Sequence, residues 1–124
     1  MPNKQPSLLL VDDNRSFISL LSKLLEKEGY AVNTCYSGKE ARLVIGKSKF
    51  DIVVSDMYMN DGNGIELLTW LHDTHSTSKI ILMSGVMDQD RLKDITLFKQ
   101  KLGDFQTITK PFKVDELIAL INKH

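Results

Sequence analysis

The sequence predicts an α/β protein built on a doubly wound, five-stranded parallel sheet. Short apolar runs without polar alternation recur along the chain, as expected of strands that are covered on both faces. After each run, apolar residues follow at helical spacing, so strands and helices alternate five times. Five such units in 124 residues are too few for a closed barrel, which needs about 250 residues.

The first unit is a strand at 7–11 followed by a helix. The strand has the sequence Ser-Leu-Leu-Leu-Val and runs directly into Asp12 and Asp13. Gly29 is expected to end the helix, because glycine readily adopts the left-handed conformation found at helix ends. Five apolar residues of the helix are expected on one face: Phe17, Leu20, Leu21, Leu24 and Leu25.

The second unit begins with a weaker strand at 31–35, which is expected near an edge of the sheet. Ser37 and Glu40 have the spacing of a capping box and open the next helix. That helix is expected to turn three apolar residues inward: Ala41, Val44 and Ile45.

The third unit contains the apolar run Ile-Val-Val at 52–54, which ends at Asp56. Turn-forming residues follow at 60–64, and Asn63 with Glu66 is a plausible start of the third helix. The remaining elements are expected as a strand at 79–84, a helix at 88–102, a strand at 106–110 and a helix at 114–121. This arrangement suits the flavodoxin-like strand order 2-1-3-4-5.

The composition is that of an ordinary soluble domain, with 42% hydrophobic and 26% charged residues. Sixteen basic and sixteen acidic residues give a formal net charge of zero, so no global field favours nucleic acid or an anionic membrane. We expect one cytoplasmic domain over 1–124 with a flexible segment at 1–6, since no apolar run is long enough for a membrane span or signal peptide. The single Cys35 is interpreted as a small buried residue.

Polar side chains stand at the carboxyl ends of four predicted strands, which the fold gathers at one edge of the sheet. Three carboxylates there need a counter-charge, and magnesium suits a site of a few carboxylates and waters. Lysine and serine can hold a phosphate group. A carboxylate nucleophile with these neighbours is typical of phosphoryl transfer to an aspartate. The residues are Asp12, Asp13, Asp56, Ser84 and Lys110.

These motifs resemble those of the receiver domains of two-component response regulators, over nearly the whole chain. The family has a paired acid after strand one, an aspartate ending strand three, Ser or Thr ending strand four, and Lys-Pro after strand five. The matching segments are Val11-Asp12-Asp13-Asn14, Val54-Ser55-Asp56-Met57-Tyr58-Met59, Met83-Ser84-Gly85 and Thr109-Lys110-Pro111-Phe112.

The resemblance implies a role for each site residue. Asp56 would be the phosphoacceptor, and Asp13, Asp56 and the backbone carbonyl of Tyr58 would bind magnesium, for which manganese can substitute. Asp12 would act through a metal-bound water. Ser84 and Lys110 would contact the phosphoryl group, and the Lys110–Pro111 bond would be cis.

The resemblance also implies a signalling domain whose only chemistry is self-catalysed, magnesium-dependent phosphotransfer and autodephosphorylation. The phosphodonor would be a sensor histidine kinase or a histidine phosphotransfer protein. The surface formed by the fourth predicted helix (88–102), the fifth predicted strand (106–110) and the fifth predicted helix (114–121) would then signal to an output protein or domain, and a homodimer could form on phosphorylation. No direct contact with nucleic acid or membrane is expected. Whether the chain is a single-domain regulator or part of a longer one stays open.

Two positions depart from the family pattern. Asn60 stands where proline is usual, which affects only a local turn. Thr107 stands where Tyr or Phe is usual, and that aromatic moves together with the strand-four hydroxyl during switching. We therefore expect phosphorylation to change the output surface less than in a relative that has this aromatic, or to act through another residue. Phe105 and Phe112 are the nearest candidates to replace the aromatic.

Three other functions fit the sequence less well. An aspartyl phosphatase would place a second acid where Tyr58 stands, and a dinucleotide-binding loop would have a glycine at Leu67. A calcium loop would need a ligand at Tyr58 and a glycine at Asp61. A receiver-like interaction module that takes no phosphate is the remaining alternative, and the intact set of acids and lysine argues against it.

Overall fold

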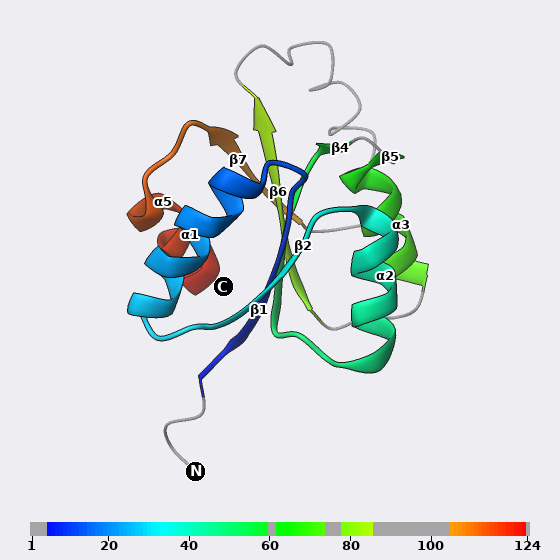
Figure 1. The fold of residues 1–124 in the computed structure, drawn as a ribbon, viewed down its shortest axis with the longest axis horizontal. Coiled ribbons are helices and arrows are strands. Elements are labelled where there is room, and N and C mark those ends of the chain that lie inside the picture. Colours follow the sequence, from blue (N-terminus) through cyan, green and yellow to red (C-terminus); the bar gives the residue numbers. More distant parts are fainter. Residues whose placement is uncertain (1–4, 60–61, 74–77, 86–104, 124) are drawn as a thin grey trace.

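The computed structural model of the chain describes residues 5–59, 62–73, 78–85 and 105–123 (Figure 1). Within these ranges the chain forms a five-stranded parallel sheet and a two-stranded ladder. The strands are β1 (Ser7–Val11), β2 (Ala31–Cys35), β3 (Ile52–Asp56), β4 (Tyr58–Met59), β5 (Gly62–Asn63), β6 (Lys79–Gly85) and β7 (Gln106–Lys110). The helices are α1 (Arg15–Lys27), α2 (Gly38–Lys47), α3 (Gly64–Asp73) and α5 (Val114–Asn122).

The main sheet has the order β2-β1-β3-β6-β7, with all neighbours parallel. The predicted doubly wound architecture and strand order are thus confirmed, and β2 lies at an edge as expected. The predicted helix at 88–102 and residues 1–4 of the predicted flexible segment lie outside the described residues.

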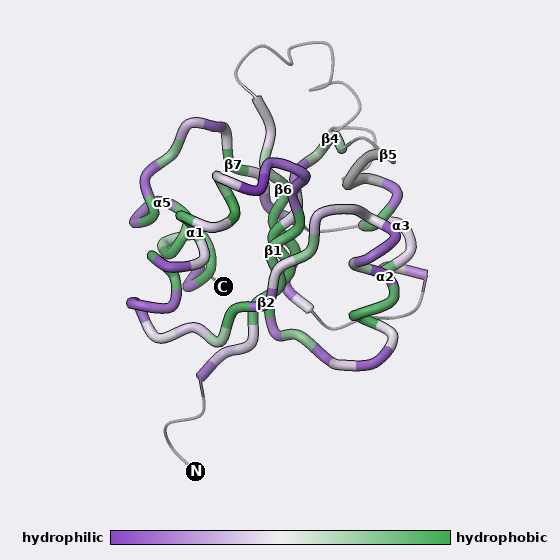
Figure 2. Tube along the Cα trace, viewed as in Figure 1, coloured by the Kyte–Doolittle hydropathy of each residue, from purple (hydrophilic) through white to green (hydrophobic). Residues whose placement is uncertain are grey.

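Helices cover the sheet on both faces, with α1 and α5 on one face and α2 and α3 on the other (Figure 1). Successive residues of a strand point to opposite faces, so each buried strand feeds both layers. In β1, Leu8 and Leu10 join the cluster under α1 and α5, whereas Leu9 and Val11 join the cluster under α2 and α3. The apolar central strands stand out in Figure 2 against the mixed helices. This two-sided burial explains why the strands lack polar alternation.

The ends of the helices follow the predicted local chemistry in most details. Gly29 has a φ of 98°, in the left-handed region that favours glycine. The Ser37 hydroxyl accepts a hydrogen bond from the Glu40 backbone N–H, as a capping box requires. The Glu40 carboxylate accepts from the N–H of Tyr36, one residue before the predicted partner.

The predicted apolar face of α1 is wrong at one position. Leu20 is 61% exposed, and Ile18, which was not predicted to face inward, is only 1% exposed. Leu21 and Leu25 lie in the core as predicted. Positions 18, 21 and 25 follow helical spacing of three and four residues, which places Leu20 on the opposite side.

Candidate functional site

The carboxyl ends of β1, β3, β6 and β7 meet at one edge of the sheet, the upper end in Figure 1. Parallel pairing sets this arrangement: Val11 is in register with Ser55, Asp56 with Met83, and Gly85 with Lys110. The acidic residues that follow β1 therefore lie beside the last residue of β3. One oxygen each from Asp12, Asp13 and Asp56 lies within 4.8 Å of the others.

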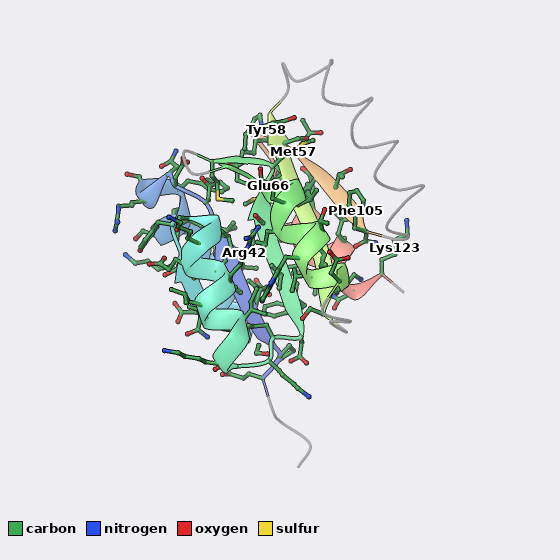
Figure 3. The ribbon with its side chains drawn as sticks, turned by 90° about the vertical axis from the view of Figure 1, so that its right-hand side faces the viewer. Arg42, Met57, Tyr58, Glu66, Phe105 and Lys123 are labelled. Atoms are coloured by element: carbon green, nitrogen blue, oxygen red, sulfur yellow. The ribbon has the colours of Figure 1, made fainter. Side chains whose placement is uncertain are left out.

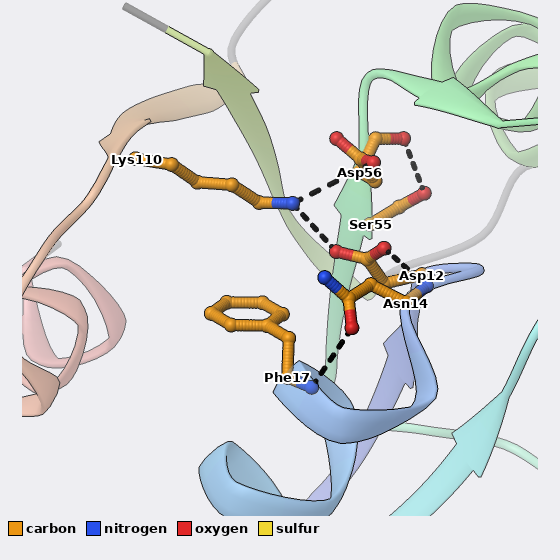
Figure 4. Close-up of polar contacts among 6 residues, drawn as sticks. All are labelled: Asp12, Asn14, Phe17, Ser55, Asp56 and Lys110. Carbon is orange, nitrogen blue, oxygen red and sulfur yellow. Dashed lines mark hydrogen bonds and ion pairs between the residues drawn. The ribbon is translucent and has the colours of Figure 1, made fainter.

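Asp12 is the most deeply buried of the three acids, at 1% exposure. One of its oxygens, Oδ2, lies 2.7 Å from the ammonium nitrogen of Lys110, which is 26% exposed (Figure 4). The other, Oδ1, accepts a hydrogen bond of 3.0 Å from the backbone N–H of Asn14. A buried carboxylate needs such partners, and Asp12 has an ion pair and a hydrogen bond.

Asp56 ends β3 and keeps 17% of its side chain exposed. Its Oδ2 lies 3.6 Å from the Lys110 ammonium, a longer contact than that of Asp12. Burial and the negative charge of Asp12, with a smaller contribution from Asp13, raise the pKa of Asp56 to about 6, although Lys110 and a backbone hydrogen bond from Tyr58 oppose the increase. The carboxylate is thus accessible and held in a site that disfavours its negative charge.

The acid cluster fits a hard divalent cation. Its three carboxylates supply oxygen ligands, and Asp13 and Asp56 are only partly buried, which leaves room for metal-bound water. Burial first, and the charges of Asp12 and Asp13 second, raise the pKa of Asp56, and a bound cation would favour its charged form against both. Over the ranges that the structure describes, this is the one group of three or more acidic, histidine or cysteine residues with metal-binding geometry.

Ser84 and Thr107 share one face of the sheet. Ser84 is 7% exposed near the end of β6 and is in register with Thr109 of β7. Thr107 lies two residues before Thr109 and thus on the same face, in register with Leu82. Phe105 packs with Leu82 and Met57 in a cluster of buried residues.

The loop after Asp56 is more ordered than the sequence predicts. Tyr58 and Met59 pair with Asn63 and Gly62 in an antiparallel ladder. Tyr58 follows Asp56 by two residues, and Figure 3 shows it at the upper end of the molecule, seen from the side of α2 and α3. After Lys110, the peptide bond to Pro111 is cis.

Sequence reasoning missed two features of the site. Phe17 was treated as part of the core, but its ring lies under the Lys110 ammonium, 4.6 Å from nitrogen to ring centroid. The direct ion pair between Asp12 and Lys110 was also missed. The strand order shows that Lys110 lies near the acids, but it does not show which of the acids Lys110 contacts. Phe17 is the third residue of α1 and follows Asp13 by four residues, and this closeness to the acids was the available signal.

A family model described as the response regulator receiver domain matches residues 8–122, nearly the whole chain. The chain belongs to this family. It is a receiver domain of a response regulator in two-component signalling, and therefore a signalling domain.

Relatives and solved structures agree with this assignment of the receiver domain. The chain is 37% identical over 114 residues to the transcriptional regulatory protein CpxR of Escherichia coli K12. The match covers 92% of this chain and 47% of CpxR. The chain thus spans about half the length of this relative. The Francisella response regulator 1452 receiver domain superposes with a TM-score of 0.82 at 28% identity, covering 95% and 94% of the two chains.

A second solved structure is a response regulator from Burkholderia pseudomallei described with a phosphorylated aspartic acid, a calcium ion and citrate. This structure matches with a TM-score of 0.82 at 25% identity, and the match covers 96% of this chain and 68% of the Burkholderia pseudomallei chain.

In the described part of this receiver domain, no helix has both the length and the apolar character to cross a bilayer.

Proposed function

We propose that this receiver domain accepts a phosphoryl group on Asp56 from a sensor histidine kinase or a histidine phosphotransfer protein. The observation that carries the proposal is the position of the Asp56 carboxylate. It is 17% exposed at a strand end, 3.6 Å from Lys110, and grouped with two further acids. A partly accessible carboxylate with a cation beside it is suited to nucleophilic attack on phosphorus.

In the proposed transfer, an Asp56 oxygen attacks the phosphorus atom of the donor. A new oxygen–phosphorus bond forms as the donor's phosphorus–nitrogen bond breaks, and the electron pair leaves with the donor imidazole. The product is an acyl phosphate on Asp56. Lys110 is close enough to meet the negative charge of the incoming oxygens, since its ammonium already lies between Asp12 and Asp56.

Asp12, Asp13 and Asp56 would hold magnesium, or manganese in its place, with the Tyr58 carbonyl as a further ligand. The ion would supply positive charge that offsets repulsion between these carboxylates and the phosphoryl oxygens. Asp12 is already paired with Lys110, so Asp13 and Asp56 are the better direct ligands and Asp12 suits a water-mediated role. The Burkholderia pseudomallei response regulator is described with a calcium ion together with a phosphorylated aspartic acid, which supports a divalent cation as a companion of the phosphorylated state.

Ser84 and Thr107 would connect phosphorylation to the output surface. Ser84 lies near the end of β6, where its hydroxyl can donate to a phosphoryl oxygen after a small movement. Thr107 lies on the same face but is too small to fill the space that such a movement leaves. Phe105 faces the same layer, whereas Phe112 packs against Phe17 on the other side, so Phe105 is the better substitute for the missing aromatic.

The wider biological role follows from the same proposal. The domain would work in the cytoplasm as a single unit over 1–124, with a flexible segment at 1–6, and without direct contact with nucleic acid or membrane. It would pass its phosphorylation state to an output protein or domain, with a homodimer as one form of the active state. CpxR, a transcriptional regulatory protein, is an example of a relative in which such a domain serves a regulatory output.

The proposal is tested by treating the purified domain with acetyl phosphate and following its intact mass. With magnesium present, we expect one added phosphoryl group per chain. Excess chelator should abolish labelling, and Asp13→Asn should reduce it because a metal ligand is lost. Full labelling in chelator would contradict the proposed role of the acid cluster.

A further inference from the structure

The Lys110 ammonium touches an aromatic ring as well as two carboxylates. Its nitrogen lies 4.6 Å from the centroid of the Phe17 ring. In Figure 4 the ring lies below the ammonium group, whereas Asp56 lies above it. The lysine is therefore held between an aromatic face and the acids, at a distance typical of a cation–π contact.

The Phe17 ring is itself held in place by its surroundings. It packs edge-to-face against Phe112, with centroids 6.0 Å apart and an angle of 88° between the rings. Its backbone N–H donates to the side chain of Asn14, the residue that caps α1. Both rings also pack against the core cluster under α1 and α5. The ring is thus a fixed surface, fastened at the start of α1.

Lysine carries its ammonium on a flexible chain of four carbons with several rotatable bonds. The ammonium can therefore occupy many positions when only carboxylates attract it. An aromatic face adds attraction from its quadrupole without adding a negative charge. It can hold the ammonium near Asp56 without competing for the metal or repelling phosphate. A leucine of similar apolar character would fill the space but would not attract the cation.

We propose that Phe17 is a positioning residue for phosphoryl transfer, which acts by holding the Lys110 ammonium beside Asp56. The proposal rests on the proposed function, because Lys110 must meet the phosphoryl group for its position to matter. It assigns a role in the reaction to a side chain of α1 that touches neither the metal ligands nor the phosphoacceptor in the described contacts.

The test compares Phe17→Leu, which loses the aromatic face, with Phe17→Tyr, which keeps it. With acetyl phosphate and saturating magnesium, we expect the phosphorylation rate to fall about 3- to 10-fold in the leucine variant and to stay within about 2-fold in the tyrosine variant. In a Lys110→Met background, Phe17→Leu should have no further effect. An equal fall in that background would overturn the proposal, because Phe17 would then act independently of Lys110.

Proton NMR of the untreated protein gives a second readout that needs no phosphoryl transfer. The ring current of Phe17 should shift the ε-methylene protons of Lys110 upfield in the wild type, and Phe17→Leu should return them towards ordinary lysine values. Ordinary values in the wild type would overturn the positioning role even if transfer is efficient. If the upfield shift is present but no variant or wild-type protein is labelled, the ring contact stands and the proposed phosphoacceptor function fails.

Discussion

The ammonium nitrogen of Lys110 lies 2.7 Å from Asp12 and 3.6 Å from Asp56. The closer contact neutralises the negative charge of Asp12, which is almost fully buried. The longer contact offsets the negative charge of Asp56 only in part. Burial and the charge of Asp12 raise the pKa of the Asp56 carboxyl, and the single positive charge of Lys110, which also serves Asp12, offsets this increase only in part. The ion pair with Asp12 also makes Lys110 important to the stability of the metal-free protein.

Replacing Lys110 with methionine should destabilise the metal-free domain by about 2 kcal/mol. The change leaves the buried Asp12 carboxylate without its cation, but the cost is below the roughly 3–5 kcal/mol of a fully buried pair because Lys110 is 26% exposed. Magnesium should recover more stability in this variant than in the wild type, since it replaces the lost charge. Urea unfolding with and without magnesium measures both effects. An unchanged midpoint in chelator would show that the ion pair contributes little.

Stability of the metal-free domain should fall as the pH rises through about 6, because of Asp56. Its pKa is raised from 3.8 in the unfolded chain to about 6 in the folded protein, so the folded state holds this proton more tightly. The stabilisation is fully present below about pH 4 and is lost as the pH rises through 6. Two pKa units correspond to about 3 kcal/mol at most, and partial exposure lowers the expected loss to about 1–2 kcal/mol.

The matched variant for this prediction is Asp56→Asn, which cannot titrate. In chelator it should be about as stable as the wild type near pH 4 and about 1–2 kcal/mol more stable at pH 7.5. Urea unfolding across this range gives the difference, which removes the contribution of other acids. A difference that does not vary with pH would mean that Asp56 titrates normally.

The sequence was sufficient for the sheet but not for the orientation of every helix. Each strand is a short apolar run, and runs buried on both faces allow little else. In α1, apolar residues cover so much of the circumference that spacing alone could not tell whether Leu20 or Ile18 faces the sheet, and the structure buries Ile18. The ladder of β4 and β5 was missed because two-residue strands have no periodicity to detect.

The site was predictable to the level of which residues gather, because parallel strands bring their carboxyl ends together. The cluster of Asp12, Asp13 and Asp56 and the proximity of Lys110 follow from this topology. The choice of Asp12 as the closer partner of Lys110, and the ring of Phe17 beneath it, depend on side-chain packing between elements distant in sequence. The local sequence places Phe17 near the acids, but it does not encode which side chains meet.

Lys79 should stabilise the end of α5. Its ammonium donates to the backbone carbonyl of Ile121, at 2.9 Å, and to that of Lys123, where carbonyls at a helix end lack intrahelical partners. Lys79→Met should therefore cost about 0.5–1 kcal/mol and speed amide exchange near Ile121. Lys47→Met, at the exposed last turn of α2, is the control: it also removes a cation near a helix end, so it should cost less than Lys79→Met and leave amide exchange near Ile121 unchanged. Equal effects of the two variants would argue against a specific cap.

Thr107 should limit how far phosphorylation alters the output surface. Burying one aromatic ring is worth about 1.5–3 kcal/mol, and threonine cannot supply that difference between the two states. Amide chemical shifts with and without beryllofluoride should therefore change less at 90–102 in the wild type than in Thr107→Tyr. Changes of equal size in both proteins would show that this position is not limiting. A Phe105→Leu variant then tests whether Phe105 substitutes for the missing aromatic.

The identity of the phosphorylated residue tests the account most directly. Acetyl phosphate and magnesium are added, the acyl phosphate is trapped by borohydride reduction, and the modified residue is located by tandem mass spectrometry. We predict modification at Asp56 alone, with no labelling of Asp56→Asn, because this acid ends β3, keeps 17% of its side chain exposed and lies 3.6 Å from the Lys110 ammonium. Labelling of Asp56→Asn to the wild-type level, or modification at Asp12 or Asp13 in the wild type, would contradict the account.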